Sequence, residues 1–366
     1  MTASWAIVTG EYPPRPGGVA DYTRLVATAL AGTGDEVHVF FPASREPALM
    51  DEHVVAHPIE SGFGTRGLRQ LSAALARLPR SRHLLVQWVP HAFGWKAMNV
   101  PFALWAARQR DLWVMFHEVS FPRGTGLKGD VLSAATSFMA ARLARSAHRI
   151  FVAIPAWTEI LRPFGVATDP LWLPVPSNVP TELPAAEVEA TRRRLPEGPL
   201  VGHFGTYGSN IAALLAPALR LLLREFSVVL LGRGAERFLA ESDLPRDRIV
   251  ATGALDAPVL AQHIAACDVM VQPYPDGASS RRGSLMAALA LARPVVTTEG
   301  RLSESIWRES GAVRLSSLAA EDLAACTREL VHDEGARREL GARSRALYSD
   351  RFALEHTVRL LRAADR

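Results

Sequence analysis

The chain is short of cysteine, of lysine and of long apolar runs, and each shortage excludes a class of protein. Cys267 and Cys326 are its only cysteines, and they lack the close spacing of a metal or redox motif. We expect both thiols to be reduced members of a folded core. No apolar run approaches the roughly 20 residues that a membrane span needs. The first residues include no basic segment and carry Glu11 early, which is not typical of a signal peptide. These absences predict a cytoplasmic protein.

Lysine is nearly absent, since Lys96 and Lys128 are the only lysines among 41 basic residues, and the net charge is only +4. Such a preference for arginine is typical of genome composition rather than of a binding function. No concentrated basic stripe with aromatic residues occurs, so nucleic acid is not an expected partner. A helix-like stretch at 68–78 repeats leucine at helical spacing and has arginines around it. It is either a surface helix of a folded domain or a weak contact with the inner face of a membrane. These arginines are Arg66, Arg69, Arg77, Arg80 and Arg82.

Several catalytic motifs are missing as well. The chain has no Asp-x-Asp pair, and its histidines are scattered without the spacing of metal ligands, so we expect neither a metal nor another cofactor. No Walker A loop occurs, which excludes the usual kinases and ATPases. No Gly-x-Ser-x-Gly elbow occurs, which argues against an α/β-hydrolase.

What the sequence does contain is a repeated alternation of apolar, strand-like runs with helix-period segments. In the first half the expected strands are 5–9, 37–41, 83–88, 112–116, 149–153 and 170–173. The expected helices are 19–31, 68–78, 97–108, 132–145 and 156–161. In the second half the expected strands are 200–204, 227–231, 249–251, 269–272 and 295–298, with helices at 211–224, 259–265 and 284–291. Short strands that alternate with longer helices predict parallel sheets covered on both faces.

A proline-rich run at 174–184 separates the two series and predicts a linker. With 366 residues the chain has room for about two domains. We therefore expect an α/β fold of two Rossmann-like domains, 1–178 and 179–349, whose parallel sheets face a cleft. The helical C-terminal segment breaks near 348–352, and its last helix, 350–366, is expected to pack back on the first domain. In such sheets, ligands bind outside the carboxyl ends of the strands.

The most informative segment is Asp276–Val296, in which two arginines stand between a predicted strand and a predicted helix. The helix begins at Gly283, and its first turn offers unpaired backbone N–H donors and a partial positive charge. Arg281 and Arg282 add forked, charge-assisted donors. The segment predicts a phosphate site, and the alternative is an ordinary helix start with solvated arginines. The other residues of this predicted site are Ser280, Ser284 and Leu285.

A second glycine-containing loop follows the first predicted strand. It runs from Gly10 through Pro13-Pro14 to Gly17-Gly18-Val19-Ala20, and a predicted helix begins there. Paired glycines let the backbone approach a ligand closely, and the helix start points to the same place. The order of strand, Pro-Pro, Gly-Gly and helix resembles the N-terminal signature of the family 4 glycosyltransferases. These are retaining enzymes with the two-domain GT-B fold.

The resemblance covers nearly the whole chain, through the segments 33–40, 202–206, 230–234 and 260–273. It implies that the first domain binds the acceptor and the second binds a nucleotide sugar, without a metal. In that arrangement Gly17 and Gly18 approach the donor from the first domain. The loops after two strands of the second domain are implied to contribute Gly205, Thr206, Gly232 and Arg233.

Two departures from the family pattern concern the donor site. The family usually has two glutamates separated by seven residues, and the corresponding positions here are Ser279 and Ala287. The second of these glutamates typically binds the ribose hydroxyls, which an alanine side chain is unable to do. The loop after Phe204 also lacks the family's arginine and lysine for the diphosphate. The chain is therefore either a divergent branch, in which Arg281 and Arg282 restore the charge, or an inactive copy.

A histidine and a glutamate end the predicted strand 112–116. His117 and Glu118 resemble the family's His-acidic pair near the sugar, and Glu118 could fix the tautomer of His117 or bind the sugar. We count both as catalytic candidates, together with Arg281 and Arg282. The nearby run 87–94 mixes aromatic and polar residues, which suits either a carbohydrate or a packed loop. Four tryptophans are expected to pack in the interior, namely Trp88, Trp95, Trp105 and Trp113.

The sequence therefore predicts a cytoplasmic, metal-independent retaining glycosyltransferase. Its partners would be a nucleotide-sugar donor and a carbohydrate, lipid-linked or small-molecule acceptor; the oligomeric state stays open. Two alternatives remain. A nucleotide-sugar epimerase of the same fold would need acidic and basic groups beside the sugar, which Glu118 and Glu11 supply only in part. A non-catalytic module that binds a glycan or a partner transferase would explain the two missing glutamates.

Overall fold

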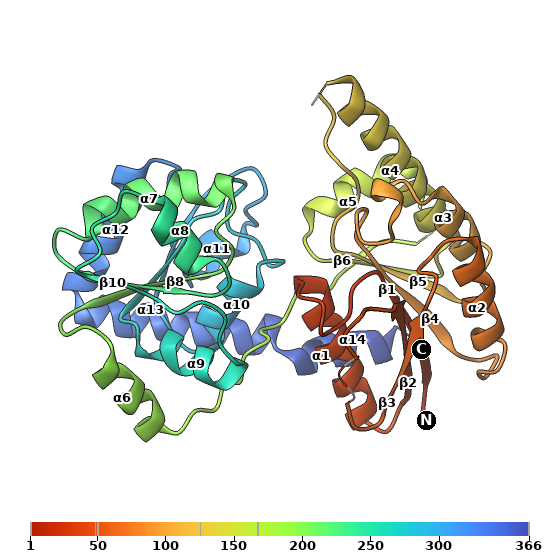
Figure 1. Ribbon diagram of the computed structural model, residues 1–366, viewed down its shortest axis with the longest axis horizontal. Helices are drawn as coiled ribbons and strands as arrows, with labels where there is room; N and C mark the ends of the chain where they lie inside the picture. The colour runs from red at the N-terminus through yellow and green to blue at the C-terminus, as the bar shows by residue number, and fades with distance from the viewer. Residues whose placement is uncertain (1, 48, 50, 125, 167, 365–366) are drawn as a thin grey trace. The chain divides into compact units, whose positions relative to one another are not determined.

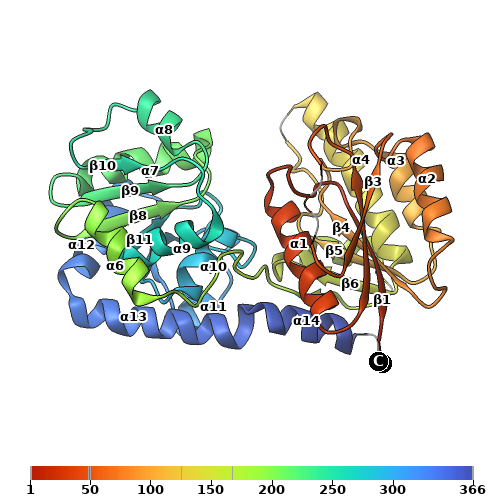
Figure 2. The same cartoon turned by 60° about the horizontal axis from the view of Figure 1, so that its bottom comes forward.

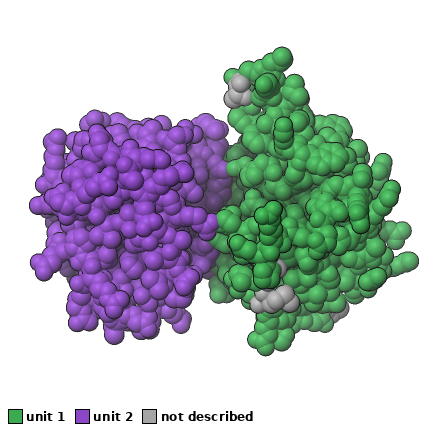
Figure 3. All heavy atoms as spheres, viewed as in Figure 1, with its two compact units in different colours: residues 1–174, 354–366 green, residues 175–353 purple. Residues whose placement is uncertain are grey.

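A computed structural model describes residues 2–47, 49, 51–124, 126–166 and 168–364 of the chain. It contains two compact units, coloured separately in Figure 3. Unit 1 comprises Met1–Pro174 and Leu354–Arg366, and unit 2 comprises Val175–Ala353. The first boundary lies four residues before the one expected from the sequence.

Unit 1 contains a sheet of seven strands in the order β3-β2-β1-β4-β5-β6-β7, and its strand pairs are parallel (Figure 1). The inner strand β1 is buried along Trp5–Val8, because helices cover both faces of a parallel sheet. The strands are β1 (Ser4–Thr9), β2 (Glu36–Pro42), β3 (Val54–Ile59), β4 (His83–Trp88), β5 (Leu112–Phe116), β6 (Arg149–Val152) and β7 (Leu171–Trp172).

The helices of unit 1 bury one face each against this sheet or a neighbouring helix. In α2 the side chains of Leu68, Leu71 and Leu75 are buried. The apolar face of this helix therefore belongs to the core, and its interpretation as a membrane contact is wrong. The helical segments are α1 (Gly18–Gly32), α2 (Thr65–Leu75), η1 (Trp95–Ala97), α3 (Val100–Ala106), α4 (Leu127–Ser146), α5 (Ala156–Leu161), η2 (Arg162–Phe164) and α14 (Leu354–Ala363).

Unit 2 contains a second parallel sheet, of six strands in the order β10-β9-β8-β11-β12-β13. Its strands are β8 (Leu200–Phe204), β9 (Ser227–Leu231), β10 (Ile249–Ala251), β11 (Val269–Gln272), β12 (Val295–Thr298) and β13 (Arg314–Ser316). Its helical segments are α6 (Ala185–Arg194), α7 (Ser209–Leu222), α8 (Ala235–Glu241), α9 (Ala257–Ala266), α10 (Gly283–Ala290), α11 (Ile306–Ser310), α12 (Ala320–His332), α13 (Glu334–Leu347) and η3 (Tyr348–Phe352).

Each sheet has one point at which the strand order reverses. In unit 1 this switch point lies between β1 and β4, and in unit 2 it lies between β8 and β11. In doubly wound folds, ligands bind outside the carboxyl ends of the strands at such a point. The topology therefore marks one candidate ligand-binding edge in each unit.

Two connecting segments differ from the sequence interpretation. The proline-rich run expected to be a linker is attached to unit 2, since the Val175 N–H donates to the Ser280 carbonyl at 3.0 Å and the Ser177 N–H to the Tyr348 hydroxyl at 3.1 Å. At the other end, the helix break falls at Ala353, which has extended backbone after η3. Beyond it α14 packs against α1 in unit 1, as Figure 2 shows.

No helix in the described part of the chain combines the length and the apolar character that crossing a bilayer requires.

Candidate active site

Buried polar side chains gather at the switch point of unit 2. His203, near the end of β8, and Gln272, at the end of β11, are at most 1% exposed. His203 donates from Nδ1 to the Val271 carbonyl at 2.8 Å, while its Nε2 makes no hydrogen bond with a described residue. Burial lowers the pKa of His203 to about 4, against smaller opposite effects of the main chain at Val271 and Thr206. The ring is therefore neutral, with Nε2 an acceptor.

Both side-chain polar atoms of Gln272 are also buried without a hydrogen-bond partner in the described ranges. A buried amide that makes no bond is costly, and a native protein rarely keeps one without a ligand or an ordered water. The Gln272 amide and Nε2 of His203 can therefore still form hydrogen bonds with a ligand at this edge of the sheet. This is the position at which a polar ligand of a doubly wound fold is expected.

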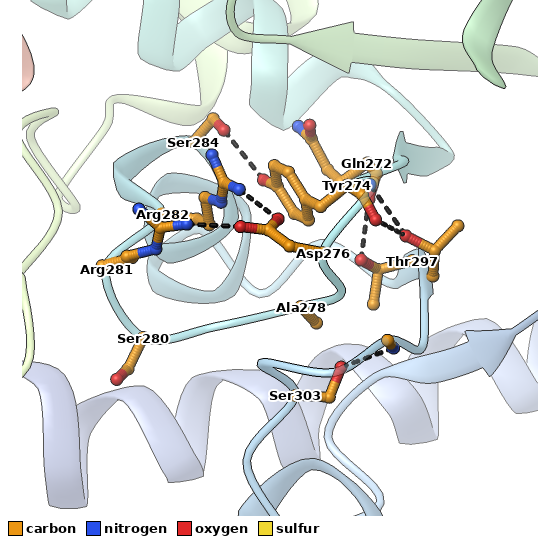
Figure 4. A network of polar contacts seen from close by, with 12 residues as sticks. Gln272, Tyr274, Asp276, Ala278, Ser280, Arg281, Arg282, Ser284, Thr297 and Ser303 are labelled. Atoms are coloured by element: carbon orange, nitrogen blue, oxygen red, sulfur yellow. Dashed lines mark hydrogen bonds and ion pairs between the residues drawn. The ribbon is translucent and has the colours of Figure 1, made fainter. Parts of the chain in front are cut away.

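The two arginines of the loop between β11 and α10 share one carboxylate. Arg281 and Arg282 each form an ion pair with Asp276, whose side chain is 16% exposed (Figure 4). Burial alone would raise the pKa of Asp276, but the two guanidinium groups hold it below its ordinary value. Two positive charges and one negative charge leave one net positive charge at the start of α10. The arginines are therefore paired with a carboxylate and not freely solvated, and the phosphate site stays a prediction.

Arg282 also lies over the ring of Tyr274, with its guanidinium carbon 4.8 Å from the ring centroid. The Tyr274 hydroxyl is 2.9 Å from Oγ of Ser284, in the first turn of α10. Burial raises the pKa of Tyr274 to about 12, so this hydroxyl stays protonated. The carboxylate, the aromatic ring and the helix start together fix the direction of the Arg282 fork.

Ser280 is attached to a carboxylate that the sequence analysis did not identify. Its N–H donates to Oε1 of Glu304 at 2.8 Å, and its hydroxyl bonds to the same atom. Glu304 also accepts from Nε1 of Trp307 at 2.8 Å. Burial raises the pKa of Glu304, against the smaller opposite effect of these donors. Glu304 thus anchors the arginine loop to the segment that follows β12, a role that spacing along the sequence did not indicate.

The glycines of the predicted site meet at the ends of β8 and β9. A Cβ added to Gly232, whose φ is 106°, would lie 3.0 Å from the Gly205 carbonyl oxygen. At Gly205 it would lie 3.5 Å from Oγ of Ser284. The structure therefore brings Gly205, Gly232 and Ser284 together. It leaves Thr206 and Arg233 exposed and buries the side chain of Leu285 in the core.

Unit 1 has its own buried polar pair. Nε2 of His117 donates to Oε1 of Gln87 at 2.8 Å, and burial lowers the pKa of His117 to about 3. The imidazole is therefore neutral and carries its proton on Nε2, so Nδ1 is an acceptor. Trp157 holds the adjacent main chain by donating to the His117 carbonyl at 2.8 Å. Gln87 rather than Glu118 fixes the tautomer, which corrects the sequence interpretation.

Glu11 and His91 form a second pair, at the switch point of unit 1. They follow β1 and β4, and Oε1 of Glu11 lies 3.6 Å from Nε2 of His91. The nearby Glu11 carboxylate raises the pKa of His91. The charge of Glu118 raises it further, and burial opposes both effects. A Cβ at Gly17 would lie 2.0 Å from Oε2 of Glu11, at the mobile end of that side chain. A Cβ at Gly18 would meet nothing within 4 Å.

The four tryptophans of unit 1 that were expected to pack differ in burial. Trp88 and Trp113 are each 1% exposed, and Trp105 is half-buried. Trp95 is 52% exposed, so the expectation of a packing role is wrong there.

Over the residues that the structure describes, no group of three or more His, Cys, Asp or Glu side chains has an arrangement able to hold a metal ion. The absence of a metal from the reaction stays a prediction.

Comparisons with known proteins identify both units. The model described as Glycosyltransferase Family 4 matches residues 16–174, and the one described as Glycosyl transferases group 1 matches residues 198–333. Together they span both sheets except β1. A search of curated protein sequences gave no significant match.

Solved structures share the fold over its full length. A sucrose-phosphate synthase from Thermosynechococcus elongatus is 18% identical, with 99% of this chain and 98% of that chain covered at a TM-score of 0.80. WaaG, a glycosyltransferase involved in lipopolysaccharide biosynthesis, is 14% identical, with 99% and 98% covered at 0.69. Anabaena Alr3699/HepE, solved with UDP and glucose, is 17% identical, with 99% of both chains covered at 0.71. The predicted GT-B fold of two Rossmann-like domains is confirmed.

Proposed function

This chain belongs to the family 4 glycosyltransferases, and we propose that it transfers a sugar from a nucleoside diphosphate to an acceptor hydroxyl with retention and without a metal. The observation that carries the proposal is the pair of guanidinium groups oriented by Asp276 at the start of α10. Oriented arginines beside a helix N-terminus suit a diphosphate, because both supply donors to its anionic oxygens.

In the proposed reaction the C1–O bond to the diphosphate breaks and its electron pair stays on the phosphate oxygen. The acceptor hydroxyl bonds to C1 on the same face, and its proton passes to that phosphate oxygen. Arg281 and Arg282 stabilise the charge that develops on the leaving group, which is electrostatic catalysis by preorganised donors. Asp276 keeps both side chains in place before the donor arrives, so less ordering remains for the binding step.

Unit 1 is proposed to bind the sugar. The neutral ring of His117 has an acceptor at Nδ1, which suits a sugar hydroxyl. A charged imidazolium would have no acceptor, so burial and the bond to Gln87 both preserve this capacity. Glu118 is half-buried beside it and is retained as a second sugar-binding candidate.

UDP is the donor nucleotide to test first, because Anabaena Alr3699/HepE was solved with UDP, with UDP and glucose, and with UDP-glucose. The positions of the two missing family glutamates, Ser279 and Ala287, are both 0% exposed. Neither side chain supplies a carboxylate to the ribose, and this favours the non-catalytic module as the second candidate function.

One experiment separates the candidates. The purified chain is screened by thermal shift with UDP, GDP, ADP and dTDP, and is then incubated with the matching nucleotide-glucose in EDTA. We expect one nucleotide to raise the melting temperature by mass action. Proton NMR should then show slow release of glucose. The anomer that forms first should have the same configuration at C1 as the donor. Isomerised donor would indicate the epimerase, inversion would contradict retention, and a lack of any shift would favour the non-catalytic module.

We further propose that the protein works in the cytoplasm in weak contact with a membrane surface, through α4 rather than α2. Leu127, Val131 and Phe138 are 84%, 56% and 48% exposed, and their spacing places them within about 40° on one helix face. Exposed Arg123 and Lys128 adjoin this apolar stripe, which suits an anionic surface.

Sedimentation with vesicles of phosphatidylglycerol and phosphatidylcholine tests this contact. Replacing the three apolar residues of the stripe with serine should lower the bound fraction several-fold. Val259→Ser, at a 39% exposed residue of unit 2, is the matched control. Equal sedimentation of the two variants would refute the contact.

A further inference from the structure

The loop between β4 and α3 contains an unusual backbone turn. Gly94, Trp95, Lys96 and Ala97 have φ values of 84°, 53°, 52° and 68°. Left-handed backbone is disfavoured for residues with a Cβ and normally occurs at isolated positions. Three such residues in succession form one left-handed turn, and strained backbone of this kind persists only where its surroundings fix it.

Asn99 and an aromatic stack fix this turn. The Asn99 side chain, at 2% residue exposure, donates from Nδ2 to the carbonyls of Phe63 and Phe93 at 2.9 Å each. Its Oδ1 accepts from the Phe102 N–H at 3.1 Å. The rings of Phe93 and Phe102 stack with centroids 4.1 Å apart. Asn99 and the stacked rings thus hold the buried side of the loop, where Ala97 also lies, while Trp95 and Lys96 are exposed.

The turn displays an indole ring. Trp95 is 52% exposed, whereas Trp5, Trp88, Trp113 and Trp307 are at most 1% exposed. Hydrophobic burial favours the interior for such a ring, and the backbone strain favours a different turn. One residue thus carries two unfavourable features that a purely structural loop would not retain, and the combination points to a function.

The loop begins at the polar edge of unit 1. It leaves β4 through His91, which pairs with Glu11, and its next residue, Ala92, packs against Gly10. A Cβ at Gly10 would lie 2.4 Å from the Ala92 carbonyl oxygen, so the β1 and β4 loops are in close contact. Trp95 follows His91 by four residues. An exposed ring and hydrogen-bonding side chains therefore occur on one loop pair.

We propose that Trp95 is a specificity-determining residue for the acceptor, which is a pyranoside whose apolar C–H face stacks on the indole. Glu11 and His91 form hydrogen bonds with hydroxyl groups of the same sugar. A pyranose suits this combination because it presents an apolar face and a rim of hydroxyls. The exposed large apolar residues of this loop are Trp95 and Met98, the latter at 36%. This inference rests on the proposed function for the identity of the reaction, but not for sugar binding.

The binding test uses the full chain labelled with 5-fluorotryptophan and observed by fluorine NMR. Trp95→Phe assigns the Trp95 resonance. The probes are methyl glycosides of glucose, galactose, mannose and N-acetylglucosamine. We expect at least one of them to shift the Trp95 resonance saturably while the resonances of buried tryptophans stay in place. A static Trp95 resonance with all four probes would overturn the proposal.

The kinetic test compares transfer with donor hydrolysis, using the methyl glycoside that binds. Trp95→Ala should raise the acceptor KM about tenfold, with a smaller effect on donor hydrolysis, and Trp95→Phe, which keeps an aromatic face, should largely restore the KM. Trp105→Phe, at a half-buried residue of α3, is the control. An unchanged acceptor KM in Trp95→Ala would refute the assignment.

The two proposals fail in different ways. If nucleotide binds and donor is hydrolysed while the Trp95 resonance is static, only this inference is wrong. If the resonance shifts with a glycoside while no nucleotide binds, the sugar subsite stands and the transferase function is wrong.

Discussion

Replacing both Arg281 and Arg282 with alanine is expected to weaken binding of the donor nucleotide at least about 100-fold. A hydrogen bond to a charged group contributes about 1.5–3 kcal/mol, so two oriented guanidinium groups contribute enough for that loss. The double variant also leaves the Asp276 carboxylate at the site without its two ion-pair partners, which repels a diphosphate further. Isothermal titration calorimetry with UDP, or with the nucleotide that the thermal-shift screen identifies, measures the change.

The matched control is Arg193→Ala/Arg194→Ala, which removes the same charge from an exposed part of α6 in the same unit. It should leave affinity nearly unchanged, because exposed charges far from a ligand are screened by salt. Equal losses in the two double variants would mean that overall charge, and not a built phosphate site, determines binding. Unchanged affinity in the Arg281/Arg282 variant would contradict the site itself.

Replacing His117 with alanine is expected to lower kcat about 100-fold to 1000-fold while nucleotide affinity stays within a few-fold. Removal of one preorganised hydrogen bond that strengthens in the transition state typically lowers kcat by about this factor. The expected loss of rate has two causes. The variant lacks the acceptor at Nδ1, and the Gln87 amide loses its hydrogen bond to the imidazole. Steady-state rates of donor hydrolysis and UDP titrations measure the two quantities separately.

His148→Ala is the control, since His148 lies in the same unit and its side chain is 58% exposed. Its rate should resemble that of the unchanged chain. A kcat for His117→Ala within threefold of that value would remove His117 from the catalytic candidates.

The buried state of His117 also predicts a dependence of stability on pH. Its folded pKa of about 3 lies below the ordinary value of 6.5, so between these values the unfolded chain binds more protons. The free energy of unfolding therefore falls as pH drops below 6.5, by about 1.4 kcal/mol per pH unit for this group. His117→Gln should make the denaturant midpoint less sensitive to pH in that range. An unchanged pH slope would mean that His117 is charged in the fold.

Much of the architecture was predictable from local pattern. The alternation of apolar runs with helical segments identified most of the central strands, because a buried strand of a parallel sheet is a continuous apolar run. The edge strands β3 and β13 were missed. In β3, His57 and Pro58 interrupt the apolar pattern, as is common in edge strands, whose outer side needs no partner.

At the arginine site, the local sequence pattern predicted the loop but not the contacts that its side chains make. A strand end, two arginines and a helix start lie within one short segment, so the sequence predicted a phosphate site there. The sequence did not show that Asp276 orients both arginines or that Glu304 anchors Ser280. Glu304 lies 24 residues beyond Ser280 and reaches it only because β11 and β12 are adjacent parallel strands.

The exposure of Trp95 was likewise not predictable from the local sequence. Phe93, Gly94 and Ala97 nearby fit a packed loop, and no local signal indicates a left-handed turn at a residue with a Cβ. The loop is held by Asn99, whose bond to the Phe63 carbonyl spans 36 residues of sequence.

The sequence by itself determined the two α/β units, the family and the two glycine and arginine loops, because each is encoded by neighbours along the chain. Only the tertiary structure decided which side chains meet at the sheet edges: Glu11 with His91, His117 with Gln87, and Asp276 with both arginines. The physical reason is the parallel topology. It brings the carboxyl ends of sequence-distant strands to one edge, where burial and pairing then set the charge and tautomer of each group.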